Sequence, residues 1–85
     1  MRHIRDPAFV PLFDALPADV QALARKNFAL LKSDPKHPSL HFKRIRDDIW
    51  SVRVGRKYRA LAIEDTGRFQ WFWIGTHAEY NRLVR

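Results

Sequence analysis

The chain has 85 residues, of which 46% are hydrophobic, and it contains no cysteine. A domain of this size buries only about 60% of the surface of its unfolded chain, so the aromatic side chains are expected to supply most of the core. The lack of cysteine excludes disulfides and thiolate metal sites. No apolar run is long enough for a membrane span or a secretory signal. We therefore expect residues 1–85 to form one cytoplasmic domain with no membrane partner.

Positive charge is concentrated in one part of the sequence. The net charge is +7, and residues 36–59 hold eight of the 16 Lys and Arg residues against two Asp residues. Such a segment favours a polyanionic partner, above all a nucleic acid. Because the charges fall on predicted strands, we interpret them as a binding patch; the alternative is an ordinary solvated face. The candidate RNA-binding residues are Lys43, Arg44, Arg46, Arg56 and Lys57.

The first half of the chain has a helical pattern. A short helix is predicted within residues 8–15. A longer helix is predicted to begin at Leu16-Pro17, where proline suits the first turn, and to end at Asp34-Pro35. Its apolar residues form one stripe: Val20, Leu23, Ala24, Phe28 and Leu31. Residues 2–5 are a candidate edge strand.

From Ser39 the apolar residues alternate with a period of two, which predicts strands. One strand begins at Ser39 and ends before the Asp47-Asp48 turn, and the others cover residues 50–54, 58–63 and 69–74. Gly75 is expected to end the last strand, and residues 77–85 to form a polar tail with one or two helical turns. This order predicts an α+β domain with two N-terminal helices packed on one face of a three- to four-stranded antiparallel sheet. The other face would be left for a partner or a substrate.

The candidate catalytic residues are Arg53, Arg59, His77 and Tyr80, which follow or lie on neighbouring predicted strands. RNA cleavage through the 2′-hydroxyl needs one group to accept that proton, one to protonate the leaving 5′-oxygen, and cations to stabilise the phosphorane. Arginine suits the phosphate, and histidine titrates near neutrality. No glycine-rich phosphate loop is present, and the His residues lack the spacing of metal ligands, so we assign no metal and no cofactor.

Each of these residues also has a purely structural interpretation. Arg53 could simply be an exposed strand residue, and Arg59 could pair with Glu64 or Asp65. His77 could bond a backbone carbonyl, and Tyr80 could pack the C-terminal tail. We expect Trp71 and Trp73 to pack in the core and on the sheet rather than to stack on bases.

Three segments resemble parts of RelE/ParE-family toxins. Residues 49–61, with the sequence IWSVRVGRKYRAL, resemble the central hairpin of the family. Residues 71–80, WFWIGTHAEY, resemble its last strand, which ends in Gly-x-His or Gly-x-Arg with an aromatic nearby. Residues 38–43 resemble the entry into the strands after the helices. The order of elements agrees as well, so the resemblance spans nearly the whole chain.

The resemblance implies the toxin of a type II toxin–antitoxin pair, neutralised by a cognate antitoxin protein. The commoner activity of such toxins is that of a metal-independent endoribonuclease, an mRNA interferase that cleaves mRNA on the ribosome and inhibits translation. By this resemblance, Arg59 would bind phosphate, Arg53 would stabilise the transition state, and His77 would take the position of a catalytic His or Arg. Tyr80 would lie near the C-terminal aromatic. Ser51 stands where RelE has a Lys, so the resemblance does not identify the residue that acts as the general base.

Two other functions remain open at this stage. ParE-like members of the superfamily inhibit DNA gyrase and cleave nothing, but they generally lack the C-terminal His and Tyr. His77 and Tyr80 therefore favour the nuclease. The third possibility is a non-catalytic basic module whose charged face only docks a partner or ribosomal RNA.

Overall fold

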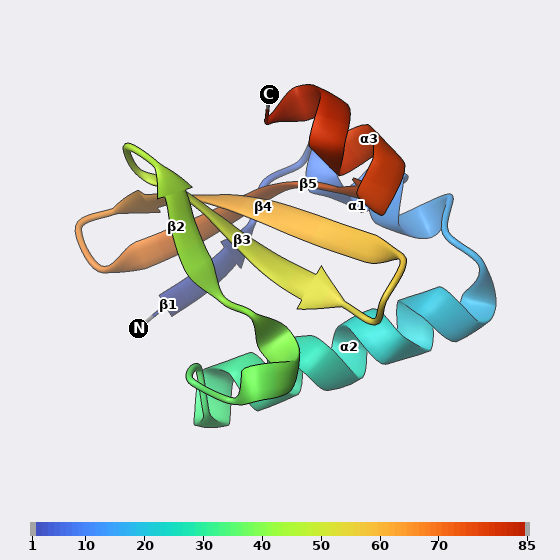
Figure 1. The fold of residues 1–85 in the computed structure, drawn as a ribbon, viewed down its shortest axis with the longest axis horizontal. Coiled ribbons are helices and arrows are strands. Elements are labelled where there is room, and N and C mark those ends of the chain that lie inside the picture. Colours follow the sequence, from blue (N-terminus) through green and yellow to red (C-terminus); the bar gives the residue numbers. More distant parts are fainter. Residues whose placement is uncertain (1, 85) are drawn as a thin grey trace.

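The structure, a computed structural model, describes residues 2–84, which form a five-stranded sheet with three α-helices (Figure 1). The elements in chain order are β1 (Arg2–Arg5), α1 (Phe9–Asp14), α2 (Ala18–Ser33), a 3-10 turn (Pro38–Leu40), β2 (Lys43–Arg46), β3 (Ile49–Val54), β4 (Tyr58–Asp65), β5 (Arg68–Thr76) and α3 (His77–Leu83). The strand order is β1-β5-β4-β3-β2. The predicted α+β class is confirmed, with five strands in place of three or four.

The additional strand is β1, which makes the sheet mixed. It pairs in parallel with β5, whereas the other three strand pairs are antiparallel. The suggested edge strand at residues 2–5 is therefore confirmed. After β1, the amide of Asp6 donates to the carbonyl of Trp71 at 2.8 Å. Helix α1 then lies beside β5, where β1 has ended.

The strand predicted from Ser39 begins later, at Lys43. Residues 38–40 instead form a 3-10 turn, in which the ring of His37 accepts a hydrogen bond from the Ser39 amide at 3.2 Å. His41 then has a left-handed φ of 46°, which strand pairing does not allow. The alternating pattern is misleading here because Leu40 is buried as the end of a turn. The last strand, predicted to cover residues 69–74 and to end before Gly75, runs two residues further as β5, through Gly75 to Thr76.

The core lies between α2 and one face of the sheet, and aromatic rings fill much of it. Trp71 is only 1% exposed, which confirms the expectation that it packs in the core. The ring of Phe28 on α2 meets it edge-on at 5.1 Å, and Phe9 of α1 meets Phe28 at 6.1 Å. The indole N–H of Trp71 donates to Nδ1 of His3 at 3.1 Å, so the buried indole has a polar partner and β1 is tied to β5.

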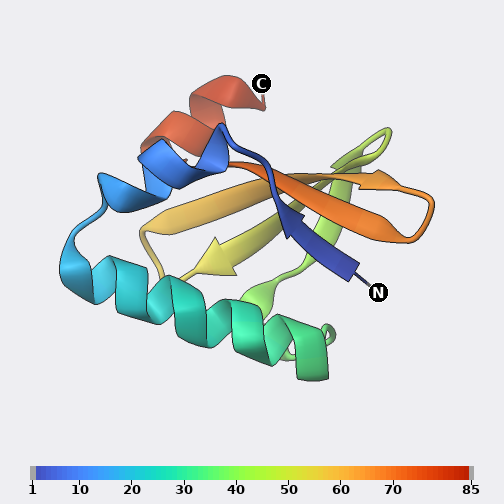
Figure 2. The same cartoon turned by 180° about the vertical axis from the view of Figure 1, so that it is seen from behind.

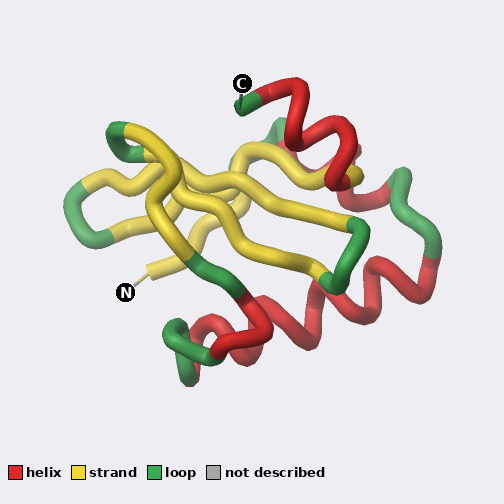
Figure 3. Tube along the Cα trace, viewed as in Figure 1, coloured by secondary structure: helices red, strands yellow, loops and turns green. Residues whose placement is uncertain are grey.

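The opposite face of the sheet carries α3, as the ribbon and tube views show with α2 below the sheet and α3 above it (Figure 3). The view from behind shows the same separation of α2 and α3 (Figure 2). The sequence predicted the helical turns of α3 but predicted that no helix covers this face of the sheet. In the structure α3 lies on it, where the hydroxyl of Tyr80 contacts Ser51 on β3 at 3.5 Å. Among residues 2–84, no helix is both long and apolar enough to cross a membrane.

Candidate functional site

Two arginines lie side by side on the face of the sheet that carries α3. Arg53 on β3 is paired in register with Arg59 on β4. Residues paired across antiparallel strands point to the same face, with Cβ atoms about 4.5–5.5 Å apart. The hairpin turn between the strands sets this register, because Gly55 has a left-handed φ of 65°, which glycine adopts without strain. The sequence-based expectation that Arg53 and Arg59 are close in space is therefore confirmed.

The two guanidinium groups are only partly satisfied by the protein. Nη1 of Arg59 donates to the carbonyl of Tyr58 at 2.9 Å. Nε of Arg53 is buried and has no hydrogen-bond partner within residues 2–84. Burial and the adjacent charge of Arg53 lower the pKa of Arg59, while Tyr80 acts in the opposite direction. None of these influences comes from a carboxylate, so the pair presents unneutralised charge and unused donors.

The suggested structural partners of Arg59 lie elsewhere. The carboxylate of Glu64 accepts a hydrogen bond from the indole N–H of Trp50 at 2.9 Å. In register, Glu64 is paired with buried Phe69, which places it on the α2 face of the sheet, opposite to Arg59. Asp65 is six residues along the strand from Arg59, about 20 Å in extended chain. Neither carboxylate is positioned to neutralise Arg59.

Helix α3 brings the other two candidate residues to the arginine pair. The guanidinium of Arg59 lies over the ring of Tyr80, 5.9 Å from its centroid. The rings of Tyr80 and His77 are stacked at 6.1 Å with an interplanar angle of 22°. The backbone amide of His77 donates to the carbonyl of Lys57 at 2.7 Å, which ties the start of α3 to the hairpin turn. His77 is exposed, so its imidazole is accessible beside the pair.

The start of α3 is fixed by a capping box that the sequence analysis did not use. The hydroxyl of Thr76 accepts from the amide of Glu79 at 3.2 Å, and the carboxylate of Glu79 accepts from the amide of Thr76 at 3.0 Å. These bonds to Thr76 lower the pKa of Glu79. Thr-x-x-Glu is a recognisable signature of a helix start, so it could have been found from the sequence. Gly75 leaves the space that this arrangement needs, because an added Cβ would lie 2.5 Å from Trp73.

Ser51 is a buried polar residue of the site. It is 2% exposed and lies on β3 below Tyr80, whose hydroxyl is 3.5 Å from its own. In register it is paired with Leu61, which places it on the same face as Arg53 and Arg59. A buried hydroxyl at this position gives Tyr80 a polar partner on the sheet, through a long contact.

The five candidate RNA-binding residues do not all lie at this site. Arg56 and Lys57 are exposed in the hairpin turn, beside the start of α3. Lys43 is paired in register with Ser51 and so lies on the same face as the arginine pair. Arg44 is paired with Trp50, on the opposite face. Nη2 of Arg46 is bonded to the carbonyl of Val84 at 2.9 Å, at the end of α3. The structure therefore places Lys43 on the face of the arginine pair and Arg56 and Lys57 in the adjoining turn.

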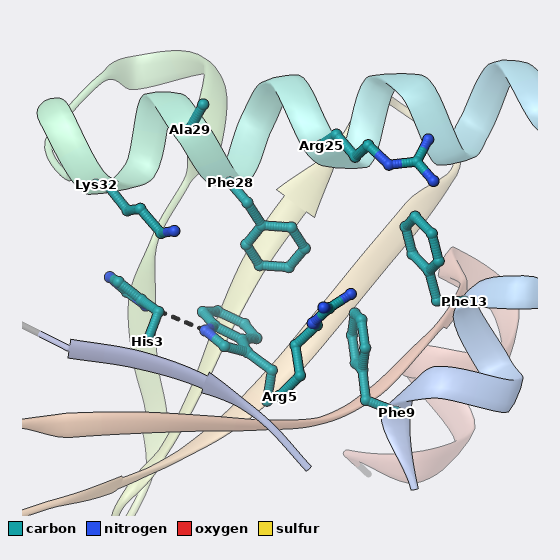
Figure 4. A pocket seen from close by; sticks show the side chains of 9 residues that line it. His3, Arg5, Phe9, Phe13, Arg25, Phe28, Ala29 and Lys32 are labelled. Carbon is teal, nitrogen blue, oxygen red and sulfur yellow. Dashed lines mark hydrogen bonds between the residues drawn. The ribbon is translucent and has the colours of Figure 1, made fainter. Parts of the chain in front are cut away.

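A second basic surface lies on the α2 side of the sheet, and the sequence analysis missed it. An open groove of about 610 Å³ runs between β1, α1 and α2 (Figure 4). Its aromatic lining is flanked by three cationic side chains: Arg5, Arg25 and Lys32. Burial, followed by the charge of Lys32, lowers the pKa of His3, which also lines the groove. The three cations come from two elements distant in sequence, so no local charge cluster signals the groove.

The described residues contain no group of three or more His, Asp or Glu side chains arranged to hold a metal ion. Two adjacent guanidinium groups can bind an anion through several charge-assisted hydrogen bonds. With an exposed imidazole and a tyrosine beside them, they form a site suited to an RNA phosphate.

Removing one member of the arginine pair is expected to stabilise the fold. Like charges directly opposite each other on paired strands are destabilising, by about 0.2–1 kcal/mol. Arg53→Met keeps most of the side-chain volume and should raise the free energy of unfolding by about that amount in urea titrations at low salt. The gain should shrink at about 1 M NaCl, where the Debye length falls to about 3 Å.

The matched control for this stability measurement is Arg56→Met, which removes the same charge from the exposed turn. An equal gain in both variants would assign the effect to net charge. A loss of stability in Arg53→Met, with no change in Arg56→Met, would show that the pair is not a source of repulsion.

Comparison with known proteins identifies the family. The family model of the ParE-like toxin domain matches residues 18–82. No curated protein matches the sequence. A chain of the RelB–RelE antitoxin–toxin complex from Methanococcus jannaschii superimposes with a TM-score of 0.74 at 12% identity, covering 96% of this chain and 99% of that one. A copper-bound mutant toxin from Helicobacter pylori has a TM-score of 0.64 at 14% identity, with coverages of 93% and 97%. The chain belongs to the family of ParE-like toxin domains, within the RelE/ParE superfamily of toxins.

Proposed function

We propose that this toxin is a metal-independent endoribonuclease that cleaves mRNA on the ribosome and so inhibits translation. The observation that carries the proposal is the register pair of Arg53 and Arg59, two adjacent guanidinium groups with unused donors. A stable fold has no need to place two like charges together and leave a buried N–H unpaired. A phosphate bound by the two guanidinium groups would supply the missing charge.

The proposed reaction is attack of the RNA 2′-oxygen on the adjacent phosphorus. The bond from phosphorus to the 5′-oxygen breaks, which leaves a 2′,3′-cyclic phosphate and a 5′-hydroxyl. Arg59 would bind the scissile phosphate with its planar fork, and Arg53 would stabilise the charge that develops on the phosphorane. Both groups are held on a rigid sheet, so little reorganisation is needed as the charge grows.

His77 and Tyr80 would complete the site. His77 would exchange a proton with the 2′-hydroxyl or with the leaving 5′-oxygen, since imidazole is the side chain suited to proton transfer near neutral pH. Tyr80 would position a nucleotide, because its ring lies near both the guanidinium of Arg59 and the ring of His77. Lys43, Arg56 and Lys57 would bind flanking phosphates without reading the sequence.

The ribonuclease proposal is tested by primer extension on mRNA in a translating extract. We expect Arg59→Ala to reduce cleavage by about 10²–10³-fold, the usual cost of one preorganised donor. His77→Ala should cost about 10²–10⁴-fold as the loss of an acid or base. Arg59→Lys should restore little, because a point charge cannot replace a bidentate fork. Arg44→Ala, on the opposite face, is the control and should cleave like the wild type.

A gyrase supercoiling assay run beside the cleavage assay tests the alternative functions. Gyrase inhibition without mRNA cleavage would replace the ribonuclease with a gyrase inhibitor. Neither activity, with RNA binding retained, would indicate a non-catalytic module. Undiminished cleavage by His77→Ala would remove His77 from the mechanism.

We further propose that a cognate antitoxin covers the face that bears Arg53 and Arg59, through an acidic or amphipathic segment. The similarity to a chain of a RelB–RelE antitoxin–toxin complex supports the existence of such a partner. The unneutralised positive charge of the arginine pair supports an acidic segment in that partner. Co-expression with the protein encoded next to this gene should relieve growth arrest. The purified pair should exclude a 2′-O-methyl RNA oligonucleotide. RNA binding that is unchanged in the complex would place the antitoxin elsewhere, and failure of the two proteins to co-purify would contradict the partnership.

A further inference from the structure

Helix α3 supplies both His77 and Tyr80, yet it is weakly held by packing. It has seven residues, and none of them is buried. Helices this short are marginal in water and depend on tertiary contacts for their stability. The interactions that dock α3 on the sheet therefore determine where the two side chains lie.

Four polar interactions hold α3 in place among the described residues. At its start, the amide of His77 donates to the carbonyl of Lys57, and Thr76 and Glu79 form the capping box. In its middle, Tyr80 makes the long 3.5 Å contact with Ser51. At its end, Nη2 of Arg46 donates to the carbonyl of Val84 at 2.9 Å, across 38 residues of sequence. The last of these joins the helix to the edge strand β2.

The Arg46 bond lies where apolar packing is incomplete. A small crevice of about 170 Å³ remains between the end of α3 and strands β2, β3, β4 and β5. Leu83, which lines it, is 56% exposed. The carbonyls of the last helical turn lack partners within the helix and carry its negative partial charge. A guanidinium is well suited to this position, because it supplies a directional donor and a compensating charge.

We propose that Arg46 is a positioning residue of the ribonuclease site: it fixes the end of α3 on the sheet and so holds His77 and Tyr80 beside Arg59. This role differs from direct RNA binding, which the charge pattern of the sequence had suggested for Arg46. The kinetic part of the inference rests on the proposed ribonuclease function. The structural part, the docking of α3, does not.

The structural part is tested by amide hydrogen exchange on the full chain. Arg46→Ala should speed exchange of the Val84 amide, which bonds to Tyr80 within α3, by about three- to tenfold, as expected for loss of one solvent-exposed hydrogen bond. Exchange in the β3–β4 hairpin should not change, which would show that the fold is intact. Arg44→Ala removes the same charge from the same strand and should leave α3 unaffected. Equal effects of the two substitutions, or no effect of Arg46→Ala, would overturn the inference.

Kinetics separate positioning from RNA binding. If Arg46 positions α3, Arg46→Ala should lower kcat by about tenfold through misplacement of the reacting groups, with KM and the salt dependence of RNA binding unchanged. If Arg46 contacts a phosphate, KM should rise and the salt slope should fall by about one, which would overturn the inference. Absence of cleavage by the wild type would refute the proposed function, and the exchange of α3 would still decide whether Arg46 docks the helix.

Discussion

The electrostatic repulsion between Arg53 and Arg59 is the constraint around which the site is built. Their charges face each other because the register of the β3–β4 hairpin places them opposite one another. Burial, followed by the charge of Arg53, lowers the pKa of Arg59. The rest of the structure must hold this pair in place against its own repulsion. Stored electrostatic energy of this kind is typical of sites that await an anion.

The core on the opposite face of the sheet provides that restraint. Side chains alternate between the two faces, so a shift of one residue in the β3–β4 register would turn one of the two strands over. That would send its arginine into the core and bring Val52 or Ala60 out of it. Both apolar residues are at most 1% exposed, so such a shift is strongly disfavoured. The packing of α2 against one face of the sheet thus fixes the geometry of a site on the other face. The amide of Asn27 on α2 also donates to the backbone carbonyl of Arg53 at 3.2 Å.

Much of the fold and part of the site could be predicted from the sequence. The alternation in residues 50–63 and the glycine in the turn are local signals, and they are sufficient to place Arg53 beside Arg59. The start of β2 could not be predicted from local signals. Leu40 and Phe42 have the alternating pattern of a strand, but His41 between them has a left-handed φ. The docking of α3 on the sheet and the bond of Arg46 to Val84 depend on contacts between distant segments. The same is true of the groove beside α2, where cations from β1 and α2 meet only after folding.

Binding of RNA phosphate by the arginine pair is the property on which the proposed site depends most directly. The measurement is an NMR titration of the arginine Nε–Hε signals of the 15N-labelled protein with a 2′-O-methyl RNA oligonucleotide, which the proposed reaction cannot cleave. The signals of Arg53 and Arg59 should shift most, because the phosphate would bind their guanidinium groups. Shifts confined to Arg5 and Arg25 in the groove beside α2, with Arg53 and Arg59 unchanged, would contradict the account.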